Sequence, residues 1–149
     1  MASHTFLVRS FTSVVGVLLL ASQQLVKCDL LTQSDMDQIA HEMRHICLAK
    51  HNITEEMANF PSRGIFPDDR EFKCYIGCLM DLTNTAKNGK FSYEAAIRQI
   101  NVLPSEYKEP FRHGVEICRN AANGIDDKCE IAYALLKCFF AASPKFYFP

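Results

Sequence analysis

Two cysteines one helical turn apart bracket the stretch CYIGC, residues 74–78, and two more bracket CEIAYALLKC, residues 129–138. The first spacing places Cys74 and Cys78 on one face of a helix. That geometry suits two bridges to two other helices better than a bond between these two cysteines. It is not the Cys-x-x-Cys spacing of a redox site, nor the paired Cys-x-x-Cys of a zinc site. These cysteines therefore predict a structural disulfide framework.

Helical periodicity extends outward from both stretches. Apolar residues recur every three to four positions, and polar capping residues precede the apolar runs. The first helix is expected to start with a capping box at Ser34-Asp35-Met36-Asp37. No stretch shows convincing strand alternation. We therefore expect an all-α domain, a compact bundle of about six short helices. The predicted helices span about 34–51, 54–60, 68–83, 92–101, 104–123 and 127–142.

Composition narrows the class of protein. The chain has 149 residues, of which 48% are hydrophobic, with 16 basic against 17 acidic side chains. This length predicts one domain. The balanced charge argues against a nucleic-acid partner, which normally requires a basic excess. The hydrophobic content excludes an intrinsically disordered chain.

Residues 1–28 are expected to be a secretory signal peptide, leaving a domain over 29–149. The apolar run 11–21 is too short to span a bilayer. Cleavage after Cys28 fits the pattern, cleavage after Ala21 or Ser22 is the alternative, and a buried N-terminal helix is the competing structural interpretation. Cleavage after Cys28 changes the formal charge from −1 to −3 and reduces the seven cysteines to six. An even number in an exported chain implies disulfides, although the count alone leaves their pairing open.

The six cysteines resemble those of the insect odorant-binding and pheromone-binding proteins. That family has three residues between the second and third cysteines and eight between the fifth and sixth, as in Cys74–Cys78 and Cys129–Cys138 here. The resemblance covers essentially the whole mature chain. It implies the pairing Cys47–Cys78, Cys74–Cys129 and Cys118–Cys138. The tail Phe146-Tyr147-Phe148-Pro149 is similar to that of the fly pheromone-binding subgroup.

The resemblance implies a secreted, non-enzymatic carrier without a cofactor. It would bind small hydrophobic odorants or pheromones in an internal apolar cavity and deliver them to olfactory receptors in sensillum lymph or a similar fluid. The implied oligomeric state is a monomer or a weak homodimer. A non-sensory carrier or scavenger of lipophilic molecules with the same fold is the alternative function.

The candidate ligand-binding residues are inward positions of the predicted helices, together with aromatic residues beside them. Ordinary core packing is the alternative role for each. Phe146, Tyr147 and Phe148 are expected to fold back as a lid. Tyr133, Tyr147, Thr83 or Thr85 are candidate hydroxyl anchors, although solvated helix ends are the favoured interpretation of the two threonines. The inward and adjacent candidates are Ala40, Met43, Ile76, Met80, Phe91, Leu103, Val115, Ala132, Leu136 and Phe139.

Three other motifs have less specific meanings. His41-Glu42-x-x-His45 matches the motif of zinc peptidases, but its histidines are expected to lie opposite the core stripe of the first helix. Zinc peptidase activity is therefore a remote alternative. Asn52-Ile53-Thr54 is a glycosylation sequon, in which Thr54 serves equally well as a helix cap. The histidines suggest an acid switch, but most are expected to be simply solvated.

Overall fold

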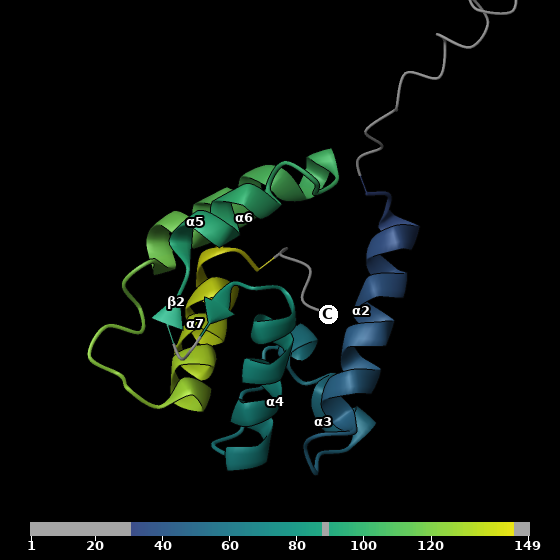
Figure 1. Ribbon diagram of the computed structural model, residues 1–149, viewed down its shortest axis with the longest axis vertical. Coiled ribbons are helices and arrows are strands. Elements are labelled where there is room, and N and C mark those ends of the chain that lie inside the picture. The colour runs from purple at the N-terminus through teal and green to yellow at the C-terminus, as the bar shows by residue number, and fades with distance from the viewer. Residues whose placement is uncertain (1–30, 88–89, 145–149) are drawn as a thin grey trace, which may run out of the picture.

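The computed structural model describes residues 31–87 and 90–144; the predicted signal peptide and the aromatic tail lie outside them. The described residues form six α-helices, a short 3-10 helix and a two-stranded ladder (Figure 1). The predicted all-α class is confirmed. The described helices include none with the length and hydrophobicity needed to cross a membrane. The elements are α2 (Gln33–Leu48), α3 (Glu55–Ala58), η1 (Pro61–Arg63), α4 (Arg70–Leu82), β1 (Ala86–Lys87), β2 (Lys90–Phe91), α5 (Tyr93–Gln99), α6 (Ser105–Cys118) and α7 (Lys128–Ala142).

Helix α2 begins earlier than its predicted capping box. Thr32 Oγ1 accepts a hydrogen bond from the backbone N–H of Asp35, and the Asp35 carboxylate accepts one from the backbone N–H of Thr32. This reciprocal pair satisfies two amide groups at the helix start. The box expected at Ser34 is therefore wrong, because Thr32 already supplies the same Thr-x-x-Asp pattern two residues earlier. The helix also ends at Leu48, three residues before its predicted end.

Helices α4 and α7 pack against each other at the centre of the molecule, and α6 packs on α7 (Figure 1). A glycine lies in each of these two contacts. A Cβ added at Gly77 of α4 would lie 3.7 Å from the Ala132 Cβ of α7, an ordinary contact. A Cβ added at Gly114 of α6 would lie only 2.7 Å from the Phe139 ring of α7. The α6–α7 contact is therefore the tighter of the two.

Three disulfides join four of the helices in series. Cys47–Cys78 links α2 to α4, Cys74–Cys129 links α4 to α7, and Cys118–Cys138 links α6 to α7. The pairing implied by the family resemblance is confirmed. Because Cys74 and Cys78 lie one turn apart on α4, this helix is bonded covalently to a helix on each side.

Ion pairs add to the contact between α4 and α7. Arg70 donates two hydrogen bonds to Asp127, at 2.7 and 2.9 Å. The Arg70 guanidinium holds the pKa of the Asp127 carboxyl well below its usual range. Lys73 is buried and donates to both Asp68 and Glu130, and these hydrogen bonds raise its pKa above the ordinary value. The ammonium group of Lys73 is therefore paired where it leaves water, as a buried charge must be.

A short ladder was not predicted from the sequence. Ala86 pairs with Phe91 and Lys87 with Lys90 in an antiparallel arrangement. Two residues per strand are too few to show the alternation from which a strand is recognised. The ladder carries the chain from the end of α4 to the start of α5, where Ser92 caps the helix as predicted.

Candidate ligand-binding cavity

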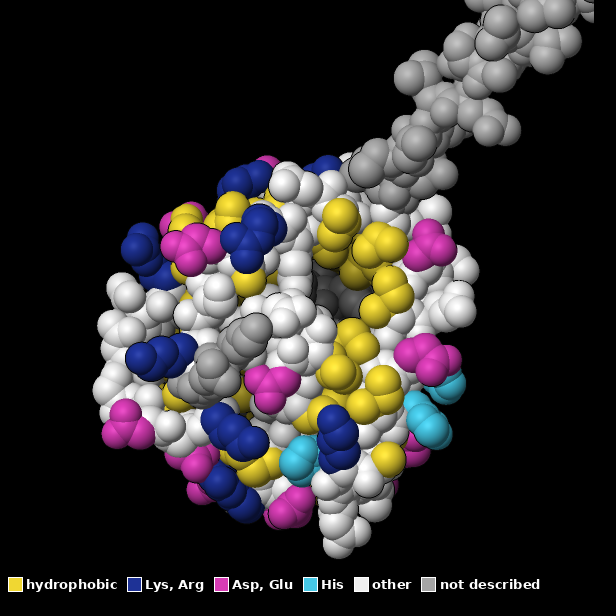
Figure 2. All heavy atoms as spheres, in the orientation of Figure 1, with side chains coloured by type: hydrophobic (Ala, Val, Ile, Leu, Met, Phe, Trp, Pro, Cys, Tyr) yellow, Lys and Arg dark blue, Asp and Glu magenta, His cyan; other side chains and the backbone are white. Residues whose placement is uncertain are grey.

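An apolar cavity of about 220 Å³ lies between α2 and the helices α4, α5, α6 and α7. Figure 2 shows the molecule hollowed there, with hydrophobic side chains around the hollow. Residues from two separate core clusters meet on its wall: Met43, Leu79 and Leu136 from one, and Ala96, Leu103, Phe111 and Phe139 from the other. The cavity therefore occupies the space that the two clusters leave between them.

Helix α2 contributes four residues to the cavity wall. Its inner face contributes Met36, Ile39, Ala40 and Met43, at the spacing of one helical stripe. The C-terminal end of α2 is bonded to α4 through Cys47. Near its N-terminal end, the Leu31 amide donates to the Val102 carbonyl at 3.1 Å, and the Tyr107 hydroxyl donates to Gln33 Oε1 at 2.6 Å. Both ends of this wall are thus attached to the remainder of the fold.

The structure places seven of the predicted binding residues on the cavity wall. They come from α2, α4, β2, the segment before α6, and α7, so five parts of the chain converge on one space. The convergence follows from the helix packing and not from proximity in sequence. The seven are Ala40, Met43, Met80, Phe91, Leu103, Leu136 and Phe139.

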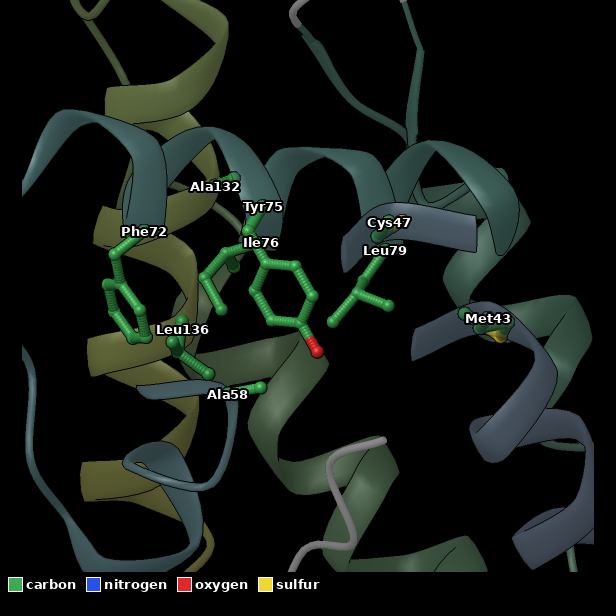
Figure 3. Packing of buried hydrophobic residues seen from close by; sticks show 9 residues of the cluster. All are labelled: Met43, Cys47, Ala58, Phe72, Tyr75, Ile76, Leu79, Ala132 and Leu136. Atoms are coloured by element: carbon green, nitrogen blue, oxygen red, sulfur yellow. The ribbon is translucent and has the colours of Figure 1, made fainter. Parts of the chain in front are cut away.

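Three predicted residues lie elsewhere. Ile76, Val115 and Ala132 are fully buried in the core clusters and are not part of the wall. Ile76 and Ala132 belong to the cluster shown in Figure 3, where α4 and α7 meet. Close helix contact leaves no open space at that position. Phe146, Tyr147 and Phe148 lie outside the described residues, so the predicted lid stays a prediction.

A larger part of the wall was not predicted from the sequence. Met36 and Ile39 share the α2 stripe with Ala40 and Met43, so this signal was present in the sequence. Ile39 and Val102 are 45% and 47% exposed at the edge of the cavity, a position that no periodicity reveals. The wall residues that were not named from the sequence are Leu31, Met36, Ile39, Leu79, Ala96, Gln99, Val102, Phe111 and Leu135, whereas Thr83 and Thr85, two of the candidate hydroxyl anchors, also lie on the wall.

Polar side chains gather at one place on this wall. Thr83 and Thr85 are half-buried there, and not freely solvated as favoured from the sequence. Gln99 lies beside them and donates through Nε2 to the Thr83 carbonyl at 2.5 Å. Tyr133, another predicted anchor, donates instead to the Phe66 carbonyl at 2.7 Å and is not on the wall. The remainder of the wall is hydrophobic.

The zinc-binding motif is on the other side of α2. His41, Glu42 and His45 are exposed, whereas Met43 and Cys47 face the interior. Across the described ranges 31–87 and 90–144, no group of three His, Cys, Asp or Glu side chains is arranged to hold a metal ion. His113 is also exposed, and His51 contacts Glu71 at 3.3 Å. These histidines do not reach the cavity wall.

Asn52, the predicted glycosylation site, is exposed between α2 and α3. The Thr54 hydroxyl of the same sequon accepts a hydrogen bond from the Met57 amide and caps α3. Glycosylation of Asn52 stays a prediction.

A second hollow, of about 310 Å³, differs in chemistry. Its lining includes the charged side chains of Lys50, Arg70, Asp81 and Lys128, together with two of the disulfides. It is larger than the cavity beside α2, but burying an apolar ligand against charged groups gains little. The apolar cavity is therefore the candidate site. A disulfide-linked helical shell around such a space fits the class of small-molecule carriers.

Comparisons with known proteins agree with this class. Residues 31–142 match the PBP/GOBP family. General odorant-binding protein 72 of Anopheles gambiae is 43% identical over 80% of this chain and 99% of its own length. Odorant binding protein 5 of Apis mellifera has a solved structure with a TM-score of 0.76, 34% identity, and coverage of 81% of this chain and 100% of that one. Odorant binding protein 7 of Anopheles gambiae, solved in complex with an azo compound, gives a TM-score of 0.61, 28% identity, and coverage of 72% and 85%.

The chain belongs to the PBP/GOBP family of insect odorant-binding proteins, of the six-cysteine type with three disulfides. This is a family of non-enzymatic carriers of small hydrophobic ligands. The His41-Glu42-x-x-His45 motif accordingly belongs to the exposed face of a carrier and not to a peptidase.

Proposed function

We propose that this protein is a secreted carrier that binds small hydrophobic odorants or pheromones in the cavity beside α2 and delivers them to olfactory receptors. The observation that carries the proposal is an apolar cavity, open at one side, that is lined mainly by helices linked through disulfides. Transfer of a ligand into this space removes its apolar surface from water, which gains roughly 25 cal/mol for each Å². The disulfides are consistent with an oxidising extracellular fluid. A monomer or a weak homodimer suffices, since one chain supplies the cavity.

The volume of the cavity limits the size of the ligand that it can hold. An apolar protein cavity of about 150 Å³ holds benzene. The present space of about 220 Å³ therefore suits a molecule somewhat larger than benzene. A volatile with roughly ten heavy atoms reaches micromolar affinity within the usual ligand efficiency. Met36, Met43 and Met80 on the wall can adapt to different shapes, because the methionine side chain is flexible.

The test is displacement of a fluorescent naphthylamine dye from the purified protein over 29–149, with the disulfides intact and after reduction. The chain has no Trp, so intrinsic tryptophan quenching is not an option. We expect saturable micromolar binding that volatile alcohols, aldehydes or esters compete for and that reduction abolishes. Failure of the oxidised protein to bind any such probe would contradict the proposal.

Two variants of α2 locate the binding. Ala40→Phe places a ring into the cavity and should weaken dye binding about tenfold, because the space no longer accommodates both groups. Gln38→Phe puts the same ring on the exposed face of the helix and should leave affinity unchanged. Equal effects of the two variants would place the dye outside the cavity.

A further inference from the structure

One polar position interrupts the hydrophobic wall, where the end of α4 meets the end of α5. Thr83 and Thr85 follow α4, and Gln99 is the last residue of α5. All three side chains line the cavity. A polar group in such a wall orients a ligand only if its hydrogen-bonding capacity is not already used within the protein. The hydrogen bonds of these three residues therefore decide what the position can recognise.

The two threonine hydroxyls form hydrogen bonds with each other and with the Met80 carbonyl. Thr83 Oγ1 lies 3.0 Å from the Met80 carbonyl oxygen and 2.8 Å from Thr85 Oγ1, and Thr85 Oγ1 lies 3.3 Å from the same carbonyl. Each hydroxyl has one proton to donate. Both protons find acceptors inside this triangle, so the threonines do not need a ligand as a hydrogen-bond acceptor.

The hydrogen bond to Thr83 fixes the orientation of the Gln99 amide. A backbone carbonyl only accepts, so the amide atom 2.5 Å from the Thr83 oxygen must be the nitrogen. The carbonyl oxygen, Oε1, is then on the other branch of the amide. Within residues 31–87 and 90–144, no protein group donates a hydrogen bond to it. Because Gln99 lines the cavity, its side chain carries an acceptor without a protein donor at the one polar place on the wall.

We propose that Gln99 Oε1 is the acceptor for a ligand hydroxyl, and that the cavity selects small apolar alcohols over isomers without a donor. This inference rests on the proposed function and adds the chemical class of the ligand. A ligand hydroxyl replaces the water that otherwise solvates Oε1, while the rest of the ligand contacts hydrophobic side chains. A ligand without a donor leaves the acceptor unpaired and is disfavoured.

Two isomers test the proposal. 1-Octanol and methyl heptyl ether have the same formula and nearly the same size, and only the alcohol has a donor. In dye competition with the disulfide-bonded protein, we expect 1-octanol to bind about fivefold more tightly than the ether, as one neutral hydrogen bond of average strength gives. A ratio near one in the unmodified protein would overturn the inference by itself, whether or not any variant folds.

The variant Gln99→Met keeps the length of the side chain and removes the acceptor. It should bring the alcohol-to-ether ratio close to one while the ether retains its affinity. Met80→Leu changes the apolar wall nearby and should shift both isomers equally. A preference for the alcohol that persists in Gln99→Met would overturn the inference while leaving the carrier function intact. No dye binding at all would instead overturn the proposed function, and this inference with it.

Discussion

Tyr75 is a single residue whose ring and hydroxyl have opposite effects on stability. Its side chain is fully buried among Ile76, Leu79 and Ala58 (Figure 3). The hydroxyl has no hydrogen-bond partner among the described residues, and burial raises its pKa to about 12. The ring therefore contributes apolar packing, while the hydroxyl loses its hydration without compensation.

Tyr75→Phe should leave the free energy of unfolding unchanged or raise it by up to about 1 kcal/mol, because only the unpaired hydroxyl is lost. Tyr133→Phe is the matched control. Its hydroxyl donates to the Phe66 carbonyl, so its removal should lower the same free energy by about 1 kcal/mol. Urea unfolding of the oxidised proteins, followed by circular dichroism, measures both. A larger loss in Tyr75→Phe than in Tyr133→Phe would show that the Tyr75 hydroxyl is paired.

At the scale of helices, the close contact between α6 and α7 involves a ring that also lines the cavity. Gly114 lets α6 approach the Phe139 ring, and that ring is part of the cavity wall. The contact between α4 and α7 at Gly77 is looser, since an added methyl group there would make only ordinary contacts. These two helical glycines therefore tolerate an added methyl group to different degrees.

Gly114→Ala should push Phe139 into the cavity, lower the free energy of unfolding by about 1–3 kcal/mol and weaken dye binding, as overpacking does. Gly77→Ala should retain both stability and binding, because alanine fits there and favours the helix. Thermal unfolding of the two variants measures the change in stability, and dye titration measures the change in affinity. Unchanged binding in Gly114→Ala would mean that α6 moves away and Phe139 stays in place.

At the scale of the whole molecule, the disulfides differ most clearly in the length of chain that each encloses. Cys74–Cys129 joins residues 55 apart in sequence, and Cys118–Cys138 joins residues 20 apart. Each bridge has one buried and one half-buried cysteine. Because the burial of their cysteines is similar, the two bridges can be compared for how much conformational entropy each removes from the unfolded chain.

Replacing Cys74 and Cys129 by Ala should lower the free energy of unfolding by about 1 kcal/mol more than replacing Cys118 and Cys138, because loop entropy grows with the logarithm of loop length. Chemical unfolding of the two double variants gives this difference directly. The opposite order would mean that local packing around each bridge outweighs the entropy of the unfolded state.

Local patterns in the sequence accounted for the helices and the cysteine framework. Ser92 and Asp127 begin helices as predicted, and Asp69 caps α4 one residue after the predicted start at Asp68, since a cap depends only on neighbouring backbone groups. The family spacing of the cysteines implied all three pairs correctly. The ladder at β1 and β2 was missed because two residues carry no readable pattern, and the start of α2 was misplaced because two adjacent capping patterns compete.

The cavity could be predicted only in part, and the reason is geometric. Periodicity shows which side of a helix faces inward, but it does not show whether another helix meets that side. Ala132 and Leu136 lie one turn apart on α7, yet Ala132 packs where α4 comes close and Leu136 faces the open space. Gln99 carried no signal at all, since a polar residue at the end of a helix is normally solvated. Sequence alone thus determined most of the helices, which depend on local chemistry, and its cysteine spacing pointed to the family, whose resemblance implied the three bridges. The tertiary structure decided where the helices separate, and hence which inward residues surround a cavity.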